Sequence, residues 1–193
     1  MNRFLEHCGA KYPIVQAPMG WIARSQLASA VCNAGGLGII ETSSGETENC
    51  MAEIEKMKGL TDAPFGVNLP IMFLKDPAIV TRVCESGVKF VTTSAGSPRK
   101  FVGPLQEAGI IVYHAVPTVA AAMGCVEAGV DGLIVEGAEG GGFKNQEEVS
   151  TLVLLQAIRR QTDIPMVAAG GIVDGAGMAA VFALGAEGVQ MGT

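Results

Sequence analysis

The chain alternates short apolar runs with stretches of helical spacing, and this repeat constrains its fold more than any other feature. Each apolar run has the length and composition of a buried strand, and the intervening residues show the periodicity of amphipathic helices. The expected strands are residues 13–16, 37–40, 65–69, 90–93, 110–116, 132–135, 165–168 and 188–191, and helical spacing is found at 25–33, 51–58, 78–85, 117–127, 149–160 and 177–184. The order strand, helix, strand therefore holds along the sequence.

This repeat predicts a parallel sheet, because the runs are apolar throughout, as expected for strands that are buried on both faces. Glycine-containing junctions stand just before several runs, where glycine can end a helix in the left-handed conformation and return the chain to the sheet. Eight such strands predict a closed (β/α)8 barrel, the TIM barrel. An open doubly wound sheet is the alternative, but residues 17–21 after the first run, Ala-Pro-Met-Gly-Trp, contain no G-x-G-x-x-G fingerprint.

The length and the apolar content favour a single domain. A chain of 193 residues with 49% hydrophobic content can bury one large core, so we expect one barrel domain over residues 1–193. The eighth run reaches Met191 and the sequence ends at Thr193. We therefore expect a barrel truncated after strand eight, lacking the final helix and the carboxyl-terminal segment of a longer protein.

Charge and cysteine content argue against several classes of function. The net charge of -6 and the scattered Lys and Arg residues disfavour nucleic acid as a partner, since binding it needs clustered cations. Glycines or charged residues interrupt every apolar run before it could span a bilayer, so no membrane insertion is expected. The five cysteines are widely spaced without a C-x-x-C pair, which disfavours a zinc site or a disulfide framework and suggests a reducing cytoplasm. No other metal site is expected.

Two glycine-rich segments indicate the chemistry of the site. Residues 139–143, Glu-Gly-Gly-Gly-Phe, and 168–171, Ala-Ala-Gly-Gly, each come after an apolar run. Glycine lets the backbone approach a ligand closely, and backbone N–H groups at such positions can hold a phosphate. The two segments therefore predict a phosphorylated cofactor.

Five motifs in a fixed order resemble those of one enzyme family. They are Tyr-Pro-Ile-Val-Gln-Ala-Pro-Met at 12–19, Gly-Val-Asn-Leu-Pro at 66–70, Glu-Gly-Gly-Gly at 139–142, Ala-Ala-Gly-Gly-Ile at 168–172 and Gly-Val-Gln-Met-Gly-Thr at 188–193. Together they resemble the nitronate monooxygenases, formerly called 2-nitropropane dioxygenases, and the related FMN-dependent enoyl-ACP reductases. The resemblance runs from the first expected strand to the last residue, which makes it more specific than any single glycine motif.

The resemblance implies a barrel that binds FMN across the carboxyl ends of its strands. The phosphate would lie on the loops after strands seven and eight, at Gly170, Gly171, Gly192 and Thr193. Barrels in general hold phosphate with these two loops, so the two arguments agree.

The same resemblance assigns the remaining cofactor-binding residues. They are Ala17, Pro18 and Met19 along the isoalloxazine ring, Asn68 as a hydrogen-bonding partner, Gly141 and Gly142 close beside the cofactor, and Glu136 and Gln190 at the ends of their strands. Met19 is equally well explained as an ordinary apolar residue at the barrel mouth. Asn68 ends a buried strand and would lack a partner there without a ligand, which favours the cofactor role.

The sequence departs from the family at Phe143. Many members carry histidine at this position, where it takes a proton from a neutral nitroalkane, and phenylalanine cannot accept one. A nitronate is already deprotonated, so its oxidation does not require this base. His114, near the end of the fifth expected strand, is the candidate catalytic residue, since its imidazole could reach the barrel mouth and titrate near neutral pH. A core histidine with its hydrogen bonds satisfied inside the protein is the alternative interpretation. Glu136 and Glu139 could form a carboxylate pair at the same rim.

These inferences lead to a flavin-dependent oxidoreductase that oxidises alkyl nitronates, or similar small carbanion-like substrates, with molecular oxygen. One alternative is an FMN-binding protein or fragment without turnover, and another is an enoyl-ACP reductase that uses NAD(P)H. The expected partners are a small-molecule substrate and oxygen, and the sequence is also compatible with a homo-oligomer.

Overall fold

The computed structural model describes residues 2–44, 46–142 and 148–192, and it contains eight parallel strands that alternate with helices. The predicted strands are all present, with bounds shifted by at most two residues, because the apolar runs that fill the core form the sheet. The strands are β1 Ile14–Gln16, β2 Ile39–Glu41, β3 Gly66–Pro70, β4 Phe90–Ser94, β5 Ile111–Val116, β6 Gly132–Glu136, β7 Met166–Ala169 and β8 Gly188–Met191.

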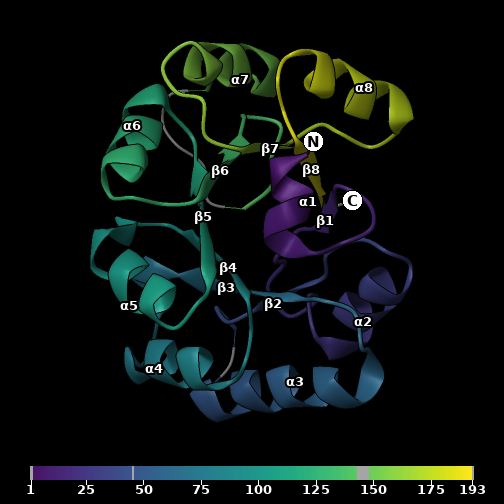
Figure 1. Ribbon diagram of the computed structural model, residues 1–193, viewed down its shortest axis with the longest axis vertical. Helices are drawn as coiled ribbons and strands as arrows, with labels where there is room; N and C mark the ends of the chain where they lie inside the picture. Colours follow the sequence, from purple (N-terminus) through teal and green to yellow (C-terminus); the bar gives the residue numbers. More distant parts are fainter. Residues whose placement is uncertain (1, 45, 143–147, 193) are drawn as a thin grey trace.

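In the described ranges, seven helices surround the strands, and one short helix lies within the ring that these helices form (Figure 1). The inner helix is α1 Arg3–Cys8, and the outer helices are α2 Ser25–Asn33, α3 Thr47–Leu60, α4 Ala78–Glu85, α5 Val102–Glu107, α6 Val119–Glu127, α7 Thr151–Arg159 and α8 Gly175–Ala183. Two 3-10 turns, η1 Ile71–Phe73 and η2 Pro98–Lys100, follow β3 and β4. The sequence pattern did not predict α1 or α5, because six residues are too few to show a helical period.

The sheet closes into the predicted barrel. Its strand order is β1-β8-β7-β6-β5-β4-β3-β2, with every neighbouring pair parallel. The segment before β2 returns to β1, where Leu37 N donates to Ile14 O at 2.8 Å and Gln16 N donates to Leu37 O at 2.9 Å. The Gln16 side chain strengthens this seam, because its Nε2 donates to Ile39 O at 3.2 Å and its Oε1 accepts from Ile39 N at 3.3 Å. The alternative of an open doubly wound sheet is therefore wrong.

The core has two parts, one between the strands and the outer helices and one inside the barrel. Helix α1 closes the amino-terminal end of the barrel with Phe4, which is fully buried. The Phe4 ring lies 6.0 Å from the Phe90 ring and 5.8 Å from the Tyr113 ring, both in edge-on geometry. Strand glycines make room for these rings, since a Cβ at Gly132 would overlap Tyr113 and a Cβ at Gly188 would lie 2.8 Å from Phe4.

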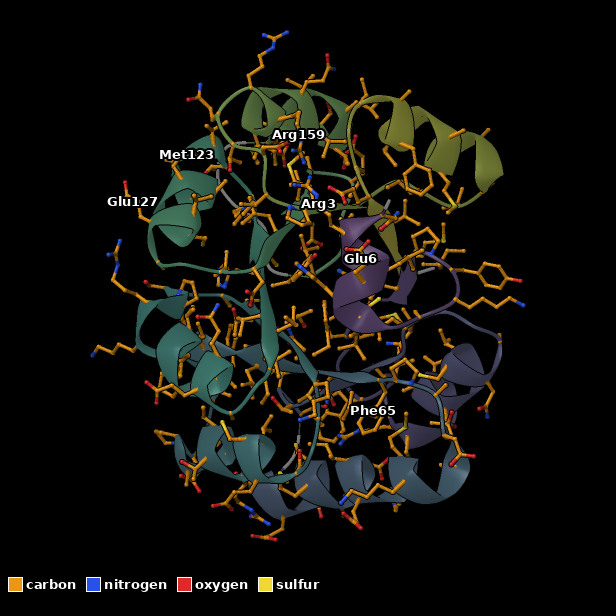
Figure 2. All side chains as sticks on the ribbon, viewed as in Figure 1. Arg3, Glu6, Phe65, Met123, Glu127 and Arg159 are labelled. Atoms are coloured by element: carbon orange, nitrogen blue, oxygen red, sulfur yellow. The ribbon has the colours of Figure 1, made fainter. Side chains whose placement is uncertain are left out.

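Ionic contacts hold α1 on the barrel. The Arg3 amide donates to Glu187 Oε2 at 2.9 Å, and the Arg3 guanidinium pairs with Glu187 and donates to the Asp163 carbonyl at 2.6 Å. Figure 2 shows Arg3 and Glu6 on this inner helix, whereas Glu127 lies on α6 at the periphery. The amino-terminal end of the barrel is thus a sealed floor, which leaves the carboxyl-terminal end for a ligand.

None of the helices in the described ranges has both the length and the apolar character needed to cross a lipid bilayer.

Candidate functional site

A cavity of about 1040 Å³ opens at the carboxyl ends of the strands. All carboxyl ends of a parallel barrel meet at the same rim, so residues far apart in sequence come together there. Every predicted site residue that the structure describes lines this cavity: Ala17, Pro18, Met19, Asn68, His114, Glu136, Gly141, Gly142, Gly170, Gly171, Gln190 and Gly192. Phe143 and Thr193 lie outside the described residues.

The wall formed by residues 17–24 is fixed by Glu41, a residue that sequence reasoning missed. Glu41 is 1% exposed, and its carboxylate accepts hydrogen bonds from Ser43 N at 2.8 Å and Ser44 N at 3.0 Å. It also accepts from Trp21 N at 3.3 Å and pairs with Arg24 at 3.2 Å. These contacts anchor the loop that carries Ala17 to Met19. The signal in the sequence was a charged residue directly after an apolar run.

Burial raises the pKa of Glu41, but hydrogen bonds from Ser44 and Ser43 and the charge of Arg24 more than offset this, so its pKa lies below the ordinary value. The carboxylate therefore stays ionised and keeps its donors.

Asn68 has a protein partner, contrary to the expectation from sequence. It is 5% exposed, and its Nδ2 donates to Thr92 Oγ1 at 2.9 Å. The reason is the strand register, which places Thr92 of β4 directly beside Asn68 of β3. The Asn68 Oδ1 atom accepts no hydrogen bond from the described residues, so the acceptor end of this amide remains available to the cavity that it lines.

His114 lines the cavity but does not titrate near neutral pH, so that expectation is wrong. Its side chain is 4% exposed, and Nδ1 lies 2.6 Å from Thr93 Oγ1. Burial lowers the pKa of His114 to about 4, although a hydrogen bond with the Gly96 backbone opposes the shift. The imidazole is therefore neutral at pH 7 and tied to its neighbours.

The two glycine segments meet at one side of the cavity. Gly170 and Gly171 have φ values of +99° and +73°, and a Cβ at Gly170 would lie 2.8 Å from Gly140 N. Side chains rarely adopt this backbone conformation, and none would fit at Gly170. Within the described ranges, the N–H groups of Gly170 and Gly171 donate to no protein acceptor. They are therefore available to a ligand in the cavity.

Thr151, the first residue of α7, joins these two segments and was also missed from sequence. Its amide donates to Glu139 Oε2 at 2.9 Å. Its hydroxyl lies 3.0 Å from three acceptors: Glu139 Oε2, the Ala169 carbonyl and the Gly170 carbonyl. Burial raises the pKa of Glu139, but the hydrogen bonds from Thr151 more than offset this and leave it below the ordinary value. Glu139 is thus engaged with α7, and the suggested Glu136–Glu139 pair is not formed.

Two polar side chains in the wall have carboxyl or amide oxygens without a hydrogen-bond donor among the described residues. Gln190 is 8% exposed, and its Oε1 is buried without a hydrogen-bond donor. Glu136 is half-buried, and none of the described hydrogen bonds or ion pairs uses its carboxylate. The two residues lie on either side of Ala169 of β7, which is the register partner of each.

The described residues contain no cluster of three His, Cys, Asp or Glu side chains that could hold a metal ion. The amino terminus of α8 is also engaged, since Asp174 Oδ1 accepts from Gly177 N at 2.8 Å. The donors that remain for an anion at this rim are loop amides.

Comparison with known proteins places this architecture in a family. The model of the family described as nitronate monooxygenase matches residues 2–79 and 71–193. A "(3aS,4S,5R,7aS)-5-hydroxy-7a-methyl-1-oxo-octahydro-1H-indene-4-carboxyl-CoA dehydrogenase" of Rhodococcus jostii (strain RHA1) is 37% identical over 188 residues, which cover 97% of this chain and 53% of the relative. The chain thus spans about half the length of that relative.

A nitronate monooxygenase of Pseudomonas aeruginosa is 34% identical over 238 residues, covering 100% of this chain and 68% of the relative. Among solved structures, FabK from Thermotoga maritima is similar to this chain with a TM-score of 0.92 and 40% sequence identity. The match covers 100% of this chain and 61% of the FabK chain. With a family model that matches nearly every residue and a relative matched over more than two thirds of its length, the chain belongs to the nitronate monooxygenase family.

Proposed function

We propose that the protein is an FMN-dependent oxidoreductase that oxidises alkyl nitronates, or similar small carbanion-like substrates, with molecular oxygen. The observation that carries this proposal is the convergence of two glycine segments and two unpartnered polar side chains on one cavity of about 1040 Å³. A cavity of this size exceeds what one drug-sized ligand needs, so it has room for a cofactor and a small substrate.

The phosphate of FMN fits the tips of β7 and β8. Gly170 and Gly171 offer amides without protein acceptors, and consecutive amides of this kind form a concave site for an anion. Gly192 and, outside the described residues, Thr193 complete the same proposed loop. Gly141 and Gly142 would pass beside the cofactor, because a Cβ at either would meet only open space.

The isoalloxazine ring fits the opposite wall. Ala17, Pro18 and Met19 supply an apolar surface, and Asn68 and Gln190 each offer a free oxygen as an acceptor for ring N–H groups. Bound FMN would supply an acceptor for two electrons and reactivity with oxygen. The protein's own contribution is to hold the ring and to orient a small anion above it.

FMN titration of the purified protein, followed by flavin fluorescence, tests the cofactor. We expect saturable binding. We expect Gly170→Ala to weaken this binding about tenfold or more, because a side chain there strains the backbone and displaces Gly140, at a combined cost of roughly 1–2 kcal/mol. Gly175→Ala is the matched control, since a Cβ at this nearby position meets nothing within 4 Å.

Oxygen consumption with ethyl nitronate then tests the reaction. A protein that binds no FMN, or equal affinity of both variants, contradicts the proposal.

A second candidate is the reduction of an enoyl thioester with NAD(P)H. It is favoured by the relative from Rhodococcus jostii, whose name describes a dehydrogenase of a carboxyl-CoA and whose identity of 37% exceeds the 34% of the nitronate monooxygenase. Anaerobic flavin reduction separates the two candidates, since fast reduction by NADPH favours the reductase and fast reduction by a nitronate favours the monooxygenase. Flavin binding without reduction by either donor would indicate a binding protein without turnover.

A further inference from the structure

The described wall of the cavity holds few groups that could move a proton. Its titratable side chains are His114, Glu136, Glu139 and Glu148, and it contains no Lys, Arg, Asp, Cys or Tyr. Three of these four are already engaged. His114 is neutral and forms a hydrogen bond with Thr93, and the Glu139 carboxylate accepts a hydrogen bond from the Thr151 amide. Glu148 is exposed, so its carboxylate is hydrated by solvent.

Glu136 differs from all three in its surroundings. It is the last residue of β6 and shares the inward face with Ile134, which packs in the barrel interior. Its side chain folds beneath the glycine loop, because a Cβ at Gly140 would overlap the Glu136 carboxyl group. The absence of a side chain at Gly140 is therefore what leaves space for this carboxyl group at the cavity wall.

No hydrogen-bond donor among the described residues replaces the water molecules that the half-buried Glu136 carboxylate has lost. Within the described ranges it receives no hydrogen bond from backbone or side chain, whereas Glu41 at the same rim receives bonds from Ser43, Ser44 and Trp21 and pairs with Arg24. A carboxylate stabilised by fixed donors is a poor proton acceptor, and one without donors is a better acceptor. The geometry of the wall thus leaves Glu136 as its free acid–base group.

We propose that Glu136 is a catalytic base that takes the α-proton from a neutral nitroalkane, which extends the substrates from nitronates to their conjugate acids. This assignment rests on the proposed function. The C–H bond breaks, its electron pair remains on the substrate as the nitronate, and the proton forms an O–H bond on the Glu136 carboxylate. The carboxyl group then releases the proton to water at the open mouth of the cavity, and the nitronate is oxidised as above.

The electrostatic environment of Glu136 also supports its role as a base. Burial raises the pKa of Glu136 above the usual glutamate value, with no opposing contribution from a cation or a donor. Among the described residues, the titratable groups that line the cavity with it are Glu139 on the following loop, Glu148 before α7 and His114 on β5, and none of them carries positive charge at neutral pH. A base with a raised pKa binds an abstracted proton more firmly, which lowers the barrier to abstraction from a weak carbon acid.

The test compares each nitroalkane with its own nitronate in the Glu136→Gln variant loaded with FMN. Glutamine keeps the shape and the hydrogen-bonding capacity toward a cofactor but cannot take the proton. We expect the ratio of kcat/KM for nitroethane to that for ethyl nitronate to fall about 100-fold or more relative to wild type. Glu148→Gln removes the same charge from the same wall, and we expect it to leave this ratio unchanged.

Infrared titration of the flavin-free protein gives an independent readout. We expect a band from a protonated carboxyl group that disappears with rising pH, with a midpoint above the ordinary value of 4.5, and that is missing in Glu136→Gln. Absence of this band in wild type overturns the assignment, as does an equal fall in both activities of Glu136→Gln together with weaker FMN binding. A wild-type protein that oxidises only nitronates also overturns it while the proposed function stands. If the wild type oxidises neither substrate, both proposals fall.

Discussion

Three glutamates at the cavity mouth show how local donors decide the state of a carboxyl group. Burial raises the pKa of Glu41 and of Glu139, but in each case hydrogen bonds to the carboxylate reverse the shift. Burial acts unopposed on Glu136 and raises its pKa. The three residues have the same ionisable group. Their different states follow from the amides and hydroxyls that fold around them.

Stability should depend on pH through His114. Its folded pKa of about 4 lies below the ordinary 6.5, so the unfolded chain binds a proton more readily between these values. The contribution is fully present above pH 6.5 and is lost as the pH falls to about 4. Its full size is roughly 3 kcal/mol. We expect the free energy of unfolding of His114→Gln to fall less steeply than that of wild type between pH 7 and pH 4, as measured by urea denaturation.

Nuclear magnetic resonance checks the same point directly, since the ring protons of His114 should titrate with a midpoint near pH 4. Parallel pH profiles for wild type and His114→Gln, or a midpoint near neutral pH, would refute the neutral, buried state of this imidazole.

The residues of the site were predictable from the sequence to the extent that they end strands. Asn68 and Gln190 lie near the ends of expected strands and Glu136 directly follows one, and all three line the cavity. Their partners were not predictable. Glu41 and Glu136 both directly follow an apolar run, and only folding shows that one receives several hydrogen bonds and the other none.

At the scale of elements, α7 organises the glycine-rich side of the cavity. Its first residue, Thr151, binds Glu139 on the loop after β6 and the carbonyls at the end of β7. A Cβ at Gly137 would overlap Thr151, so the loop can approach the helix only with glycine there. The helix amino terminus thus holds two loops in register beside each other. The sequence predicted the helix and both loops, but a threonine that starts a helix gave no sign of contacts across three elements.

Replacing Thr151 with valine should loosen this side of the cavity. Valine keeps the volume but removes the buried hydroxyl, whose single proton lies within reach of a carboxylate and two carbonyls. We expect a loss of about 1–3 kcal/mol in the free energy of unfolding. We also expect weaker FMN binding, because the tips at Gly140 and Gly170 are no longer tied together. Thr151→Ser keeps the hydroxyl and serves as the control in thermal denaturation and FMN titration. Indistinguishable behaviour of the two variants contradicts this role.

At the scale of the whole molecule, the barrel was predictable because one rule repeats along the chain. Apolar runs bury both faces of each strand, and glycine junctions return several of the helices to the sheet, so the number and order of strands follow from the sequence. The seal of the barrel was not predictable. It depends on a helix of only six residues and on aromatic rings that meet strand glycines, as Tyr113 meets Gly132 of the neighbouring strand and Phe4 of α1 meets Gly188 of β8.

This floor should therefore contribute strongly to stability without touching the cavity. Phe4 is fully buried between Phe90 and Tyr113 and is the larger of the two buried side chains of α1, so Phe4→Ala leaves a cavity that the closed ring of strands cannot collapse to fill. We expect a loss of about 3–5 kcal/mol in the free energy of unfolding, measured by urea denaturation.

Glu6→Ala on the same helix is the control, because Glu6 is exposed and surface substitutions usually change stability by less than about 0.5 kcal/mol. A loss below about 1 kcal/mol for Phe4→Ala would mean that α1 rests on the barrel without sealing it. Because Phe4 lies at the opposite end of the barrel from the glycine tips, FMN affinity at a temperature where the variant remains folded should match that of wild type. A fall in affinity comparable to that of a cavity variant would instead show that the floor and the mouth of the barrel are coupled through the strands.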